Sequence, residues 1–195
     1  MNKALMAAAV LATAFLVSSP AARAQERELT REHDGSLGAF ATLGVEYSSI
    51  VVADCFFCTG SSVDAGGAYH SARTIDGPDA ILDVGGTMAV GQAGGEFLLR
   101  ARLVFLSPAK GISAFLGYRK YWGKDEFKTF VAADLMVNFM PTVTFGARPG
   151  FGVAWDFSPI MGMWAEAAGT FGLGWGRRFG AEFTIGFQAR SYLLE

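Results

Sequence analysis

The chain has 195 residues, of which 51% are hydrophobic and only 17% are charged, and its formal net charge is −2. Ordinary soluble domains carry about 25% charged residues, so this chain is unusually apolar. Its mildly acidic balance argues against a nucleic-acid-binding protein, which needs a basic surface. Beyond the N-terminal segment there is no run of about 18 apolar residues, so a transmembrane helix is excluded on length.

Residues 1–24 have the pattern of a secretory signal peptide. Lys3 precedes an apolar run, and Pro20 is followed by a small-x-small cleavage site that ends at Ala24. We therefore expect an exported protein that is cleaved after Ala24. Residues 25–36 are charged and show no apolar period, and we interpret them as a solvated leader, with a short amphipathic helix as the alternative.

The first segment with a clear period runs from Leu37 to Tyr47. Apolar side chains occupy its odd positions, whereas its even positions include Thr42, Gly44 and Glu46. A period of two is the mark of a β-strand rather than a helix.

Residues 48–78 break this pattern and form the longest predicted connection. Loops longer than about 12–15 residues are usually functional or disordered. This one holds the only two cysteines, Cys55 and Cys58. Because an exported chain meets an oxidising compartment, a disulfide between them is our leading interpretation, with free or intermolecular thiols as the alternative. A thioredoxin-like site would need a βαβ setting, and a zinc site would need more ligands than these cysteines and His70 supply.

The alternation returns at Ala80 and continues to Tyr192. It predicts seven further strands, joined by short turns, over residues 80–90, 96–106, 111–122, 127–139, 142–157, 161–171 and 177–192. Met140-Pro141 divides two of them, and because proline cannot donate to a sheet ladder we expect the chain to reverse there. The glycine-rich segment 172–176 is predicted to be a hairpin loop, since no helix pattern follows it as in a nucleotide-binding loop.

The two parities of these strands differ in size and charge. One carries bulky apolar side chains, and the other carries many glycines and seven charges of each sign. An eight-stranded barrel has a lumen only just wide enough for side chains or one small ligand, so the bulky parity fits the outside. Charges inside can pair, whereas Lys or Arg facing lipid costs about 2–4 kcal/mol at the midplane. The predicted salt-bridge network of the lumen consists of Glu46, Asp83, Glu96, Arg100, Arg102, Arg119, Lys128, Asp134, Arg148, Asp156, Glu166, Arg178, Glu182 and Arg190.

The sequence therefore predicts an all-β fold, an eight-stranded antiparallel up-and-down transmembrane β-barrel with its apolar face outward. Closure leaves no unpaired edge in lipid, and aromatic residues near the strand ends would form two interfacial girdles. The predicted organisation is a signal peptide (1–24), a leader (25–36) and a barrel (37–195) with a long first loop at 48–78. The alternative is a soluble periplasmic barrel whose apolar face lines a ligand cavity.

Over residues 37–193 the chain resembles the small eight-stranded outer-membrane barrels of the OmpA and OmpX kind. The features that carry the resemblance are the signal peptide, the alternating strands, the lumen of glycines and charges, the aromatic girdles and an aromatic-rich last strand. The resemblance implies a place in the cell outer membrane, contact with outer-membrane lipid, insertion by the barrel-assembly machinery, periplasmic termini and no open pore.

The expected function is a structural or surface-interaction role, with the loop 48–78 as the element that contacts a surface partner. The alternatives are a small-ligand or passive transport barrel, and a lipid A-modifying enzyme. An enzyme would need an activated serine beside a base, and His70-Ser71 is the only such neighbouring pair in the mature chain. Adjacent residues of an extended segment point in opposite directions. We therefore predict no enzymatic activity, no catalytic residue, no cofactor and no metal site.

Overall fold

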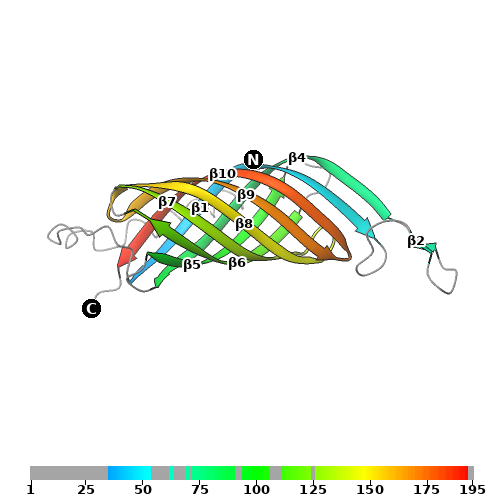
Figure 1. Ribbon diagram of the computed structural model, residues 1–195, viewed down its shortest axis with the longest axis horizontal. Helices are drawn as coiled ribbons and strands as arrows, with labels where there is room; N and C mark the ends of the chain where they lie inside the picture. The colour runs from blue at the N-terminus through cyan, green and yellow to red at the C-terminus, as the bar shows by residue number, and fades with distance from the viewer. Residues whose placement is uncertain are drawn as a thin grey trace, which may run out of the picture. The chain divides into compact units, whose positions relative to one another are not determined.

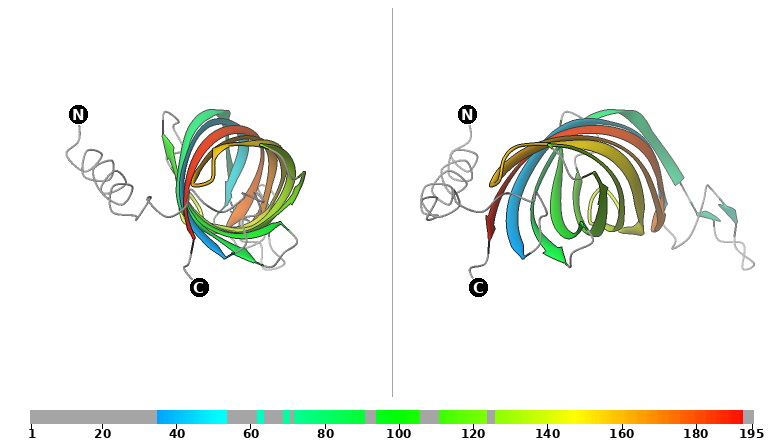
Figure 2. Two further views of the ribbon diagram at one scale, coloured as in Figure 1. Left: turned by 90° about the vertical axis from the view of Figure 1, so that its left-hand side faces the viewer. Right: turned by 60° about the vertical axis from the view of Figure 1, so that its left-hand side comes forward.

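The computed structural model describes residues 35–53, 62–63, 69–70, 72–90, 94–105, 111–123 and 126–192. Its main element is a closed antiparallel barrel with the strand order β1-β10-β9-β8-β7-β6-β5-β4 (Figure 1). Each barrel strand pairs with the next barrel strand along the chain, and the first strand closes the ring by pairing with the last (Figure 2, left). The predicted fold class is confirmed. In the parts of the chain described, no helix has both the length and the apolar character needed to cross a membrane.

All eight predicted strands occur. The barrel consists of β1 (Ser36–Ala53), β4 (Ala72–Val90), β5 (Gly95–Phe105), β6 (Gly111–Trp122), β7 (Phe127–Asn138), β8 (Thr144–Ser158), β9 (Met161–Gly174) and β10 (Gly176–Tyr192). Two short strands, β2 (Ser62–Val63) and β3 (Tyr69–His70), pair with each other in a separate sheet. The chain reverses at Met140-Pro141, between β7 and β8, as the sequence predicts.

The hairpin formed by β1 and β4 is longer than the sequence predicts. The ladder continues from Ser48 opposite Gly77 to Ala53 opposite Ala72. An irregular loop over residues 48–78 is therefore wrong at both ends, and the connection spans only residues 54–71. β4 pairs with β5 only as far back as Ala80. Before Ala80, the two faces of β4 no longer separate lipid from a packed lumen, so the two-residue period in the sequence fades.

The turn between β9 and β10 is shorter than the predicted loop 172–176. β9 continues to Gly174 and β10 begins at Gly176, so Trp175 alone lies between them. Gly176 has a φ of 128°, which glycine adopts without the steric cost that a side chain would bring. The Trp175 amide donates to the carbonyl of Val143 at 2.9 Å and ties this turn to the start of β8.

The outer face of the barrel is apolar. Leu135 and Phe151 are 69% and 67% exposed, whereas Arg119 and Arg148 are fully buried inside. Aromatic rings gather near strand ends, with Phe127 stacked on Trp155 at a centroid distance of 5.7 Å. This arrangement contradicts the alternative of a soluble barrel with its apolar face inward, because water would meet a continuous apolar surface.

Candidate functional site

The lumen is filled by a network of charged side chains. All fourteen charged residues that the sequence assigns to it are buried, because each lies on the parity opposite the apolar one. The antiparallel register sets several pairs directly across from each other, including Asp83 with Arg102 and Asp134 with Arg148. Neighbouring strands therefore supply the first contacts of the network, and longer contacts join more distant walls.

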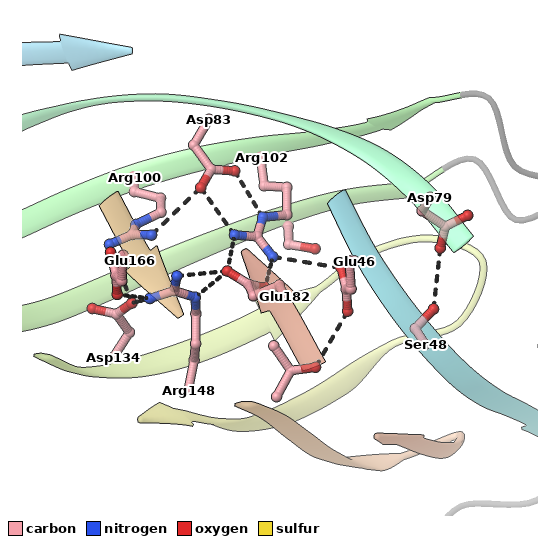
Figure 3. Close-up of polar contacts among 12 residues, drawn as sticks. Glu46, Ser48, Asp79, Asp83, Arg100, Arg102, Asp134, Arg148, Glu166 and Glu182 are labelled. Carbon is pink, nitrogen blue, oxygen red and sulfur yellow. Dashed lines mark hydrogen bonds and ion pairs between the residues drawn. The ribbon is translucent and has the colours of Figure 1, made fainter. Parts of the chain in front are cut away.

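Arg102 on β5 is the centre of the first level of the network, which lies nearest the end of the barrel where β1 and β4 extend to Ala53 and Ala72. Its Nε donates to Asp83 Oδ1 at 2.7 Å, and its Nη2 donates to Glu182 Oε1 at 2.8 Å (Figure 3). Glu46 receives two hydrogen bonds from Arg178, of which the Nη2–Oε2 bond is 2.6 Å long. These bonds join β1, β4, β5 and β10 at one level of the lumen.

Arg148 on β8 is the centre of the next level. Its Nε donates to Glu182 at 2.7 Å, and its Nη1 donates to Asp134 at 2.9 Å and to Glu166 at 2.6 Å. Arg100 lies between Asp83, at 3.4 Å, and Asp134, at 3.3 Å. Carboxylates thus bridge successive arginines, and the charges alternate in sign along the lumen (Figure 3).

Aromatic side chains, which the sequence analysis assigned mainly to the outer face, also fill the lumen. The Arg119 guanidinium lies 4.3 Å from the ring centre of Phe130 and 4.6 Å from that of Trp164. Each of these rings lies opposite a glycine on the next strand, Phe130 opposite Gly152 and Trp164 opposite Gly186. The missing side chain leaves the space that each ring occupies. This pairing of a large residue with a glycine is the signal that could have located the rings from the sequence.

The third level of the network lies toward the chain termini. Tyr121 donates to Glu96 at 2.9 Å and accepts a hydrogen bond from Arg119. Because Arg119 also pairs with Glu166, these bonds connect the third level to the level around Arg148. Asp156 receives hydrogen bonds from Arg190 at 2.7 Å and Lys128 at 3.1 Å. Tyr121 lies on the polar parity of β6 and is a member that the sequence analysis missed.

Asp79 is a second residue that the sequence analysis missed. It is buried in the lumen, one residue before the β4–β5 ladder begins, and accepts a hydrogen bond from Ser48 at 3.1 Å. It falls between the predicted loop 48–78 and the predicted strand 80–90 and was assigned to neither, although it shares the parity of Asp83. Extending the period of β4 backward from Asp83 would have found it.

Because the charged side chains of the network are buried, their pairing affects the stability of the barrel. Each buried charge has lost its hydration, which only close opposite charges and hydrogen bonds offset, so removing one partner costs about 3–5 kcal/mol. Paired side chains from opposite walls occupy the space through which a solute would pass. The arrangement therefore connects different walls of the barrel through their side chains.

The other predicted site residues lie partly outside the described chain. The proposed disulfide of Cys55 and Cys58 falls in residues 54–61, which the structure does not describe, and His70 is described only as part of the β2–β3 ladder. Within the described residues, no group of three or more His, Cys, Asp or Glu side chains is arranged to hold a metal ion.

The fold is similar to that of known membrane β-barrel structures. No protein-family model and no curated protein matches the chain. Neisserial surface protein A has a similar solved structure, with a TM-score of 0.54, 10% identity, and coverage of 77% of this chain and 96% of that chain. A de novo designed transmembrane β-barrel has a TM-score of 0.49 at 12% identity, covering 80% and 96% of the two chains. The N-terminal β-barrel domain of Pseudomonas aeruginosa OprF has a TM-score of 0.44 at 14% identity, covering 75% and 96%.

Identities this low support a common fold and nothing finer. The fold and the lumen define the class: a small, closed, eight-stranded antiparallel barrel of the kind found among outer-membrane proteins. The resemblance that the sequence pattern suggests is thereby confirmed at the level of the fold.

Proposed function

We propose that this chain is an outer-membrane protein whose closed barrel anchors a projecting β1–β4 hairpin, which contacts a partner at the cell surface. The proposal includes export by residues 1–24, cleavage after Ala24 and insertion by the barrel-assembly machinery. An apolar outer face around a ladder without free edges supports a position in lipid, because every backbone group of a closed barrel is satisfied internally.

The observation that carries the contact role is the extent of the hairpin. β4 pairs with β5 only from Ala80 onward, yet it continues to pair with β1 back to Ala72. On the outward parity of this extension lie Ser49, Thr74 and Asp76, and the one large aliphatic side chain on that parity, Val51, is buried. Polar side chains do not suit hydrocarbon, so this part of the wall fits the water beyond the membrane.

The chain termini support the orientation. Ser36 pairs with Tyr192, so both ends of the barrel chain meet at the end opposite the hairpin. With the termini on the periplasmic side, as the resemblance implies, the hairpin faces the cell exterior. The cross-linked lumen supports an anchor rather than a passive transport barrel, because its ion pairs occupy the passage.

The proposal assigns the barrel no catalytic role. An unchanged lipid A mass spectrum on overexpression is the expected result. A new acylation or deacylation product would instead favour the enzyme alternative.

The contact role is tested by shortening the hairpin without disturbing the barrel. Because Ala53 and Ala72 are directly opposite, an Asn-Gly turn can replace residues 54–71. We expect cells that carry this variant to lose surface-binding phenotypes such as adhesion or cell–cell aggregation, while the protein stays in the outer membrane. The matched control is Trp175→Ser, which alters an exposed side chain at the same end of the barrel.

Two results would contradict the proposal. One is a shortened variant that folds, reaches the outer membrane and retains every surface-binding phenotype of the full chain. The other is an equal loss of binding in the Trp175→Ser control, since the effect would then not belong to the hairpin.

A further inference from the structure

Among the described residues, one buried carboxylate of the lumen has no cationic partner. Asp79 is 4% exposed, its Oδ2 accepts a hydrogen bond from Ser48 Oγ at 3.1 Å, and its buried Oδ1 has no hydrogen-bond partner. Across the described chain, each of the other seven lumen carboxylates forms at least one ion pair. Asp79 is therefore the exception in an otherwise balanced network.

The register increases the negative charge around Asp79. It lies opposite Glu46 on β1, and Glu46 lies opposite Glu182 on β10, so three acids from adjacent strands form one row. Arg178 forms an ion pair with Glu46, and Arg102 forms one with Glu182. Asp79 adds one carboxylate to seven acids that already balance seven cations, and its charge is not offset by any lumen cation described.

Within the described residues, the β4–β5 ladder ends next to this carboxylate. Ala80, which pairs with Phe105, is the last residue of β4 to meet β5, and Asp79 is the residue before it. In Figure 3, Asp79 and Ser48 lie at the hairpin end of the row, apart from the arginine cluster, and the second carboxylate oxygen of Asp79 points away from Ser48. The buried Oδ1 is therefore the oxygen left for a cationic ligand.

We propose that Asp79, with Ser48 and Glu46 beside it, forms a binding site for a single ammonium group, either free or carried by a lysine of a polypeptide. A buried carboxylate without a partner is costly, and a cation would supply the missing pairing. Because Ser48 already occupies Oδ2, a bidentate guanidinium has only one free oxygen to meet, whereas a compact ammonium needs one. The site is independent of the proposed surface-contact role of the hairpin.

The test measures ammonium binding to the mature protein folded in detergent at neutral pH and low salt. The probes are n-butylammonium, a lysine-containing tetrapeptide, and the same peptide with the lysine acetylated. Dissociation constants come from NMR titration of the probe signals, and the protonation of Asp79 comes from its ¹³Cγ signal, assigned by its loss in Asp79→Asn. Heat-dependent gel mobility shows that each variant is folded.

We expect saturable binding of an ammonium probe, and a loss of affinity of about tenfold or more in Asp79→Asn. Ser48→Ala should weaken binding by a smaller factor. The matched control is Asp76→Asn, an exposed acid on the same strand, which should bind within about twofold of the original chain because its charge is screened by solvent. Binding of n-butylammonium alone indicates a site for free amines, and binding of the peptide as well indicates that a lysine side chain also reaches it.

Three results would overturn the inference. The first is a ¹³Cγ signal of a protonated acid at neutral pH that does not respond to either amine, since a proton would then be the partner of Asp79. The second is equal binding by Asp79→Asn and the original chain. The third is undiminished binding of the acetylated peptide, which would place the recognition outside the ammonium group.

Discussion

Arg102 and Glu182 form an ion pair across the lumen although their strands are not neighbours. Arg102 lies on β5 and Glu182 on β10, with β1 and β4 between them. The Arg102 Nη2 donates to Glu182 Oε1 at 2.8 Å, while its Nε donates to Asp83 on the adjacent strand. The network therefore connects the walls of the barrel directly, in addition to the backbone ladder.

Replacing Arg102 with methionine tests this connection. The substitution leaves the buried carboxylates of Asp83 and Glu182 with fewer partners, so we expect the free energy of unfolding to fall by about 3–5 kcal/mol. Urea unfolding of the detergent-folded barrel, followed by tryptophan fluorescence, measures it. Arg177→Met is the control, because Arg177 is only half-buried and should change stability by about 0.5 kcal/mol or less. Equal effects of the two substitutions would contradict the role of the network.

The space between Trp164 and Gly186 gives a second prediction. A Cβ at Gly186 would come within 2.5 Å of the Trp164 ring and 2.8 Å of Thr42 Cγ2. We expect Gly186→Ala to destabilise the barrel by about 1–3 kcal/mol through overpacking. In a Trp164→Ala background the same substitution should cost less, with a coupling above about 0.5 kcal/mol in a double-mutant cycle. Gly86→Ala is the control, since its Cβ would lie 3.4 Å from the nearest atom.

The apolar outer face predicts how the barrel responds to charge. Val131 lies near the middle of β7 and faces outward, whereas Phe127 lies at the end of that strand. In lipid vesicles we expect Val131→Arg to cost about 2–4 kcal/mol and Phe127→Arg about 0–1 kcal/mol, because the cost falls toward the membrane interface. Reversible unfolding from vesicles measures both. Equal costs at the two positions would argue that this face does not contact a bilayer.

Salt should have little effect on the lumen network. Its side chains, such as Arg148 and Glu166, are buried, so mobile ions screen them much less than surface pairs. We expect the urea midpoint to change little between low salt and about 1 M sodium chloride. A large fall in the midpoint at high salt would show that ions and water reach these pairs.

The sequence predicts most of this architecture because one physical constraint acts on nearly every strand. A barrel wall separates lipid from a packed lumen, so Leu135 and Asp134 must face opposite sides, and the resulting period of two is visible without any structure. The same constraint places Glu46 and Arg190 in the lumen, although their partners depend on register. Register follows from turn lengths and closure, which the period alone does not determine.

The predictions fail where this constraint weakens. The ends of the β1–β4 hairpin were missed because residues such as Ser49 and Thr74 lie where β4 no longer pairs with β5, and the outward face is no longer uniformly apolar there. Asp79 was missed for the same reason, as it lies at the boundary. The ring of Trp164 inside the lumen depends on Gly186 across the ladder, a three-dimensional complementarity that alternation does not encode.

The central claim is a closed barrel whose apolar face meets lipid, and cell fractionation with unboiled and boiled gel electrophoresis of the mature protein tests it most directly. We predict recovery in the outer-membrane fraction, with a folded band that changes mobility only after boiling. Recovery in the soluble periplasm without detergent, with no heat-dependent shift, would contradict the membrane-spanning account.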